Sequence, residues 1–130
     1  MAYLLDTNIV IHAVDGSPSV LEKMAELGGE IVLSSLCYAE LQRGYADPLL
    51  GPRHRARLEV LLRRIPIIAF DRAAADAYGL VIAQLGFIRG RDFDRMIAAH
   101  AISTRSILVT NNAADFEDIP NLSLDNWATA

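Results

Sequence analysis

Four acidic residues stand at positions from which one α/β sheet could bring their side chains together: Asp6, Glu40, Asp94 and Asp115. Asp6 follows an apolar run at residues 3–5, and Asp115 follows a second such run at residues 107–109 after a short loop. Glu40 and Asp94 fall in the early turns of predicted helices, and these helices begin at the carboxyl edge of a parallel sheet, where ligands bind. The spacing therefore predicts that the four carboxylates converge.

Carboxylates gathered in one place repel each other and raise one another's pKa, so we expect a cation among them. A small set of oxygen ligands favours Mg²⁺ or Mn²⁺. Such an ion can acidify a bound water and bind a phosphate oxygen, which is what the hydrolysis of a phosphodiester requires. The pattern therefore predicts a metal-dependent hydrolase.

Each of these acids also has a simpler explanation. Asp6 could cap the helix that begins near residue 8, and Glu40 could pair with Arg43 one turn later. Asp94 could interact with the dipole of its helix, and Asp115 could close an Asx-turn. The joint placement favours the metal site, because independent caps need not all lie at one edge of a sheet.

Polar residues beside these acids are candidates for orienting a ligand or a bound water: Thr7, Thr110 and Asn112. The alternative is that they satisfy only the backbone of the turns in which they lie. The three histidines, His12, His54 and His100, form no pair with the spacing of metal ligands.

Length and composition predict one domain spanning residues 1–130, with a hydrophobic share of 52% that is sufficient for a buried core. The single cysteine, Cys37, has no internal disulfide partner, so we expect a protein of the reducing cytoplasm. Its apolar neighbours predict that Cys37 is buried. No apolar run approaches the length that crosses a membrane, and no membrane partner is expected. The net charge of −4 argues against nucleic-acid binding through bulk positive charge.

Arginine supplies eleven of the twelve cationic residues, since the only lysine is Lys23. Arginine suits bidentate contact with phosphate better than lysine does. The candidates for RNA contact are Arg53, Arg55, Arg57, Arg91 and Arg95. The alternative for each is a solvated helix face with local ion pairs.

Apolar runs of strand length alternate with helical patterns along the chain. The strands are expected at residues 3–5, 31–33, 65–70, 107–109 and 122–124, and Pro66 places the third of them at an edge. This alternation predicts an α/β fold with a central parallel sheet of four to five strands flanked by helices.

Several motifs occur in a characteristic order along nearly the whole chain. They are Leu4-Leu5-Asp6-Thr7-Asn8, Tyr38-Ala39-Glu40-Leu41, Asp94-Arg95-Met96-Ile97-Ala98-Ala99-His100-Ala101, Leu108-Val109-Thr110-Asn111-Asn112 with Asp115-Phe116, and Asn126-Trp127. On these motifs the chain resembles the PIN-domain ribonucleases and, among them, the VapC-type toxins of bacterial and archaeal toxin–antitoxin pairs.

The resemblance implies a PIN-like three-layer fold and an endoribonuclease that depends on Mg²⁺ or Mn²⁺. It implies that the four acids named above hold the metal and are catalytic. Asp92 is a fifth carboxylate, two residues before Asp94. Since residues two apart on a helix do not share a face, we assign the metal role to Asp94, which matches the motif.

The resemblance also implies partners. Toxins of this kind cut structured RNA, often transfer RNA, and so arrest translation. They form homodimers and are inhibited by a small cognate VapB-type antitoxin, which lies across the active-site groove. Binding to promoter DNA is then expected only through the antitoxin.

Two other functions compete with this one. A phosphorylatable receiver or related phosphatase needs a lysine near a late strand, and Lys23 lies on an early helix. A non-catalytic PIN-like module, acting mainly in a regulatory complex with an antitoxin on DNA, is the stronger alternative. The presence of all four acidic positions favours the enzyme.

Overall fold

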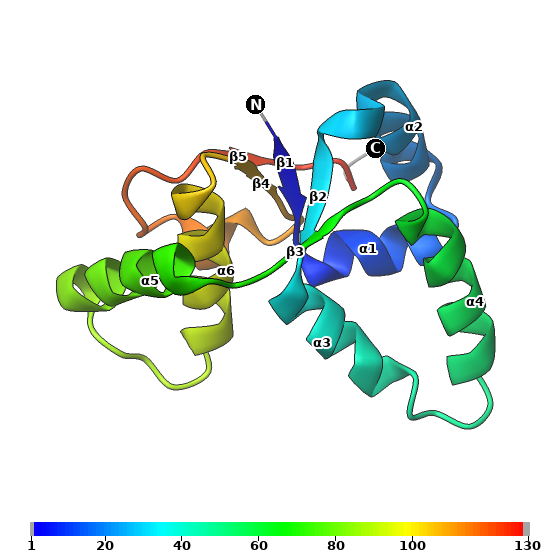
Figure 1. Cartoon of the computed structure of the whole chain (residues 1–130), viewed down its shortest axis with the longest axis horizontal. Helices are drawn as coiled ribbons and strands as arrows, with labels where there is room; N and C mark the ends of the chain where they lie inside the picture. The colour runs from blue at the N-terminus through cyan, green and yellow to red at the C-terminus, as the bar shows by residue number, and fades with distance from the viewer. Residues whose placement is uncertain (1, 129–130) are drawn as a thin grey trace.

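The computed structural model describes residues 2–128 and contains one five-stranded parallel sheet with the order β3-β2-β1-β4-β5 (Figure 1). The strands are β1 (Tyr3–Leu5), β2 (Ile31–Ser34), β3 (Ile67–Ile68), β4 (Ile107–Val109) and β5 (Leu124–Asp125). The helices are α1 (Thr7–Val14), α2 (Pro18–Leu27), α3 (Ser35–Gly44), α4 (Gly51–Leu62), α5 (Arg72–Leu85) and α6 (Asp92–Ser103), with short 3₁₀ turns η1 (Gly28–Glu30) and η2 (Ala113–Phe116). The prediction of a parallel α/β sheet is confirmed.

The strand β1 lies at the centre of the sheet and is hydrogen-bonded to β2 on one side and to β4 on the other. Leu4 and Leu5 are fully buried, as expected for a parallel strand that is covered on both faces. Figure 1 shows α5 and α6 on one side of the sheet and α1, α2 and α4 on the other. This arrangement confirms the three-layer expectation.

The two edge strands are shorter than their sequence patterns suggest. The third strand contains only Ile67–Ile68 of the predicted 65–70, because Ile65 turns inward and its N–H bonds to Leu62. Pro66 has no N–H but its carbonyl accepts from Leu33, which is the only ladder role open to proline. The last strand is Leu124–Asp125 rather than 122–124.

Side-chain caps fix where several helices begin. Asp6, Ser34 and Asp71 each accept a hydrogen bond from a backbone N–H in the first turn of the following helix. Ser17 stands at the N-cap of α2 but makes no such bond. Capping therefore explains why α1, α3 and α5 begin where the strands or loops before them end.

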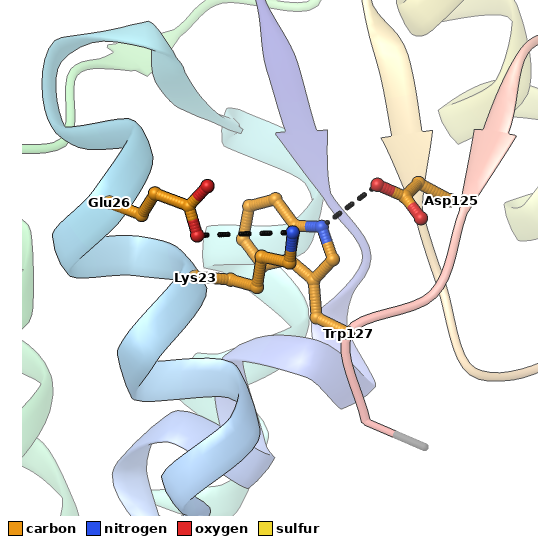
Figure 2. A network of polar contacts seen from close by, with 4 residues as sticks. All are labelled: Lys23, Glu26, Asp125 and Trp127. Atoms are coloured by element: carbon orange, nitrogen blue, oxygen red, sulfur yellow. Dashed lines mark hydrogen bonds and ion pairs between the residues drawn. The ribbon is translucent and has the colours of Figure 1, made fainter. Parts of the chain in front are cut away.

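The segment after β5 returns to the sheet and ties its edge to its centre (Figure 2). Trp127 is 2% exposed, packs 5.7 Å from the ring of Tyr3 and donates from its indole N–H to Asp125 at 3.1 Å. The carbonyl of Asp125 accepts from the N–H of Thr110 at 2.9 Å. On α2, shown in the same view, Lys23 pairs with Glu26 at 3.9 Å.

A buried polar contact joins β2 to α6. The hydroxyl of Ser34 caps α3 and lies 2.8 Å from Nδ1 of His100, and both residues are almost fully buried. Burial lowers the pKa of His100, so the ring is neutral at pH 7. Within residues 2–128, no helix combines the length and the apolar character that a membrane crossing requires.

We expect the substitution Ser34→Ala to lower the free energy of unfolding by about 1–3 kcal/mol, because it removes a helix cap and leaves a buried imidazole nitrogen without its partner. Urea unfolding followed by circular dichroism measures this. The matched control is Ser123→Ala, at an exposed serine whose backbone carbonyl alone is used, by the N–H of Leu108. Equal unfolding midpoints for the two variants would contradict the expectation.

Candidate active site

A cleft of about 680 Å³ opens at the carboxyl edge of the sheet and is lined by Asp6, Glu40, Asp94 and Asp115. Asp6 follows β1 directly, and Asp115 lies in the short turn η2 that follows β4. Glu40 comes from α3 and Asp94 from the first turn of α6. The structure thus brings together all four acids singled out in the sequence.

Asp6 is the most buried member of this group, with 6% of its surface exposed. One carboxylate oxygen accepts from the backbone N–H of Thr7 at 2.8 Å, and the other accepts from the hydroxyl of Thr110 at 2.9 Å. Burial raises the pKa of Asp6, these two hydrogen bonds oppose the rise, and the charges of Glu40 and Asp115 add to it. Asp6 is therefore both the cap of α1 and a constrained acid in the cleft.

The Thr110 hydroxyl is held in place by its surroundings. It accepts from the backbone N–H of Asn112 at 3.0 Å while donating to Asp6. Its own backbone N–H donates to β5, so the hydroxyl has little freedom to turn away. Asn112 lines the cleft, and Thr7 contributes its backbone N–H to Asp6, whereas the Thr7 hydroxyl is buried with no hydrogen-bond partner among the described residues.

Asp94 is half-buried, and its pKa is raised to about 6. Burial is the largest cause, followed by the negative charges of Asp6, Asp115 and Glu40, while Arg91 opposes the rise. The charges of the other three acids therefore act on Asp94. A group of acids in this state is stabilised by any cation that enters the cleft.

The chemistry of these donors fits a hard divalent ion, since all four are carboxylates and they share one cleft. Within residues 2–128, however, no three His, Cys, Asp or Glu side chains are grouped closely enough to hold a metal ion. Cys37 is fully buried and burial raises the pKa of its thiol to about 12, so it remains protonated and is not a ligand at neutral pH. Within the described residues the four carboxylates thus line one cleft without forming a close ligand group.

Asp92 and Asp94 have different surroundings, as expected for residues two apart on a helix. Asp92 accepts a hydrogen bond from the hydroxyl of Tyr78 on α5 and does not line the cleft. Asp94 lines the cleft. Asp92 therefore joins α5 to α6.

Three of the arginines proposed for RNA contact lie exposed on α4. Arg57 donates to the carbonyl of Val14 at 3.3 Å, and the Arg55 guanidinium lies 5.0 Å from the centre of the Tyr45 ring. Arg53 is exposed as well.

The other two candidates lie at the start of α6. Arg91 directly precedes the helix and is exposed, whereas Arg95 lies in its first turn and is buried. Arg95 is 2% exposed and its Nη2 donates to Asp118 at 3.2 Å. The prediction that Arg95 contacts RNA is therefore wrong, because the position after Asp94 faces inward on this helix.

The rest of the cleft is lined largely by residues that the sequence did not single out as functional: Ile11, Val14, Leu41, Tyr45, Leu50 and Phe93. His54 and Asp15 also line it, with Nε2 of His54 lying 4.0 Å from Oδ1 of Asp15. Much of this wall comes from α3, α4 and the segment between them. Gly51 allows α4 to begin there, because a Cβ at this position would lie 2.4 Å from the carbonyl oxygen of Tyr45. No spacing pattern announces these residues, since they meet only after the helices pack.

Comparison with known proteins places this architecture in a family. The PIN domain model matches residues 3–122. Ribonuclease VapC2 of Rickettsia felis is 38% identical to this chain, covering 98% of each sequence, and the tRNA(fMet)-specific endonuclease VapC of Shigella flexneri is 36% identical, covering 98% of this chain and 99% of that protein.

Solved structures agree with these sequence matches. The crystal structure of VapBC2 from Rickettsia felis bound to a DNA fragment from their promoter contains a chain with a TM-score of 0.86 and 37% identity, covering 98% of this chain and 99% of that one. DNA-bound VapBC from Salmonella typhimurium gives a TM-score of 0.87 at 30% identity, covering 98% of each chain. The chain therefore belongs to the PIN domain family, in its VapC group of ribonucleases.

Proposed function

We propose that this protein is a metal-dependent endoribonuclease and the toxin of a VapBC-type pair. The observation that carries the proposal is the convergence of Asp6, Glu40, Asp94 and Asp115 on one cleft, where burial and mutual repulsion raise the pKa of Asp6 and of Asp94. An acidic cluster of this kind favours the binding of a cation, because the positive charge relieves the repulsion among the carboxylates. A non-catalytic module would have no need of it, so we favour the enzyme over the regulatory alternative.

The metal would be Mg²⁺ or Mn²⁺, held by these four carboxylates. A bound ion of this type would supply a water of lowered pKa and a contact for the phosphate oxygen. Thr7 and Thr110 would keep Asp6 in place for such an ion, since they hold both of its carboxylate oxygens.

The residues around the acids have distinct tasks in this proposal. The hydroxyl of Thr110 and the N–H of Thr7 orient Asp6. Asn112 lines the cleft and is placed to orient a bound water or the substrate. With a pKa of about 6, Asp94 is mostly ionised at pH 7 and needs no further base before it binds a cation.

The substrate and partners follow from the relatives. One relative is named a tRNA(fMet)-specific endonuclease, and two similar structures are VapBC complexes with DNA. We infer that this chain cuts RNA, with transfer RNA as the first substrate to test, and that a VapB-type antitoxin inhibits it. We also infer a homodimer in the cytoplasm that reaches promoter DNA only through the antitoxin.

Asp6→Asn is expected to lower the rate of RNA cleavage in Mg²⁺ or Mn²⁺ by more than about 100-fold, because even residues that only orient metal ligands contribute 10–100-fold. The fold should persist, since an asparagine oxygen can still accept from the N–H of Thr7. A gel assay on transfer RNA and circular dichroism measure both. Asp71→Asn is the matched control, because it makes the same change at the N-cap of α5 outside the cleft. Cleavage by Asp6→Asn at the control rate would refute the site.

Asp94→Asn and Asp92→Asn distinguish the two carboxylates at the start of α6. We expect Asp94→Asn to abolish metal-dependent cleavage and Asp92→Asn to retain it, because only Asp94 lines the cleft. Mn²⁺ titration of both variants, read as initial cleavage rate, tests the assignment. The reverse outcome would move the metal role to Asp92.

RNA binding should depend on the exposed arginines of α4. In the inactive Asp6→Asn background, replacing Arg53 with Gln is expected to reduce the slope of log affinity against log salt by about 0.7, the value for one phosphate contact on a single strand. Fluorescence anisotropy over a KCl series measures the slope. Arg72→Gln, at an exposed arginine at the start of α5, serves as the control and should leave it unchanged. Equal slopes in both variants would exclude a phosphate contact by Arg53.

A further inference from the structure

The burial of Arg95 at this position costs free energy. Arg95 is 2% exposed, and its Nε and Nη1 are buried with no hydrogen-bond partner among residues 2–128. Only Nη2 is paired, with Asp118 at 3.2 Å, and Asp118 is itself 43% exposed. The guanidinium also lies in the early turns of α6, where the helix dipole disfavours a cation.

Such a residue contributes little to stability. A buried ion pair is often replaced by apolar side chains of similar volume with no loss of stability, because desolvation offsets the attraction between the charges. Two unsatisfied donors add to the cost. Stability alone therefore does not explain why an arginine stands at position 95. Its position next to Asp94 points to a second role.

The two members of the ion pair lie close in sequence to two of the four acids. Arg95 follows Asp94 directly on α6, and Asp118 lies three residues after Asp115. The turn between them is anchored in the core by Phe116 and Ile119, which are 1% and 5% exposed. The pair therefore ties the first turn of α6 to the turn that follows η2.

The two segments that it joins carry charges that push them apart. Asp94 and Asp115 both line the cleft and repel each other, so in the absence of a cation they favour a wider spacing between α6 and η2. The attraction between Arg95 on α6 and Asp118, two residues beyond the end of η2, acts in the opposite direction. Neighbouring residues on a helix point in different directions, so Asp94 can face the cleft while Arg95 faces the core.

We propose that the Arg95–Asp118 ion pair is a positioning clamp that opposes the separation of Asp94 and Asp115 and so strengthens the binding of a divalent cation in the cleft. The inference rests on the proposed metal site and adds two residues that touch neither metal nor substrate. A purely structural ion pair would support the fold and leave cation affinity alone. Loss of the clamp should instead weaken cation binding and leave the stability of the fold unchanged or higher.

The first test replaces Arg95 with Met, which has a similar length and no charge. We expect the urea midpoint of Arg95→Met to equal or exceed that of the unmodified protein, and its dissociation constant for Mn²⁺ to rise about tenfold. Isothermal titration of MnCl₂ into the purified full chain measures affinity directly, with no dependence on cleavage. An unchanged Mn²⁺ affinity would overturn the proposal, whatever the midpoint.

The second test breaks the pair from its exposed side and does not depend on how Arg95→Met folds. Asp118→Asn should weaken Mn²⁺ binding about tenfold. Glu117→Gln is the matched control, because it removes the same charge one residue nearer to Asp115 and, in the part of the chain that the structure describes, Glu117 has no ion pair. Equal weakening in both variants would mean that net charge alone is responsible and would overturn the clamp.

The double variant Arg95→Met/Asp118→Asn should bind Mn²⁺ as weakly as Arg95→Met alone, because both changes break the same contact. Additive losses would show that the two residues act separately and would also overturn the proposal. Failure of the unmodified protein to bind Mn²⁺ would refute the metal site itself. Failure of the clamp and failure of the proposed function are thus distinguishable.

Discussion

Repulsion among the carboxylates is the constraint on which the rest of this structure depends. Four acids from four different segments of the chain line one cleft, and burial together with their mutual charge raises the pKa of Asp6 and Asp94. Bringing them together costs free energy that the sheet and its helices must offset. That cost makes the cleft receptive to a cation, so the repulsion among the acids and the use proposed for them have the same origin.

The acids are held from behind by contacts outside the cleft. The hydroxyl of Thr110 donates to Asp6, and the backbone N–H of Thr110 donates to the carbonyl of Asp125. The carboxylate of Asp125 in turn accepts from the indole N–H of Trp127. This chain of contacts gives the motif at residues 126–127 a physical role: it secures the edge strand that fixes Thr110. The geometry of the cleft therefore depends on residues from the last part of the sheet as much as on the acids themselves.

Much of the fold and of the acidic cluster was predictable from the sequence, because both follow from periodic patterns. Apolar runs located β1, β2 and β4, and the edge of a parallel sheet placed the residues that follow β1 and β4 together. Features that follow no periodic pattern could not be predicted. Arg95 looked like a phosphate contact and is buried against Asp118, and part of the cleft wall depends on Gly51, where only the absence of a Cβ lets α4 approach Tyr45. Such features depend on how helices pack, which spacing along the chain does not encode.

The order of the strands has a consequence for the synthesis of this protein. The central strand β1 and Asp6 are made first, yet the hydroxyl that fixes Asp6 lies 104 residues later, and Asp115 later still. A nascent chain that has left the ribosome only as far as α5 has neither β4 nor η2, so its first carboxylate has no site to join. The cleft is therefore completed only when the last part of the sheet emerges, so its acidic residues gather late in synthesis.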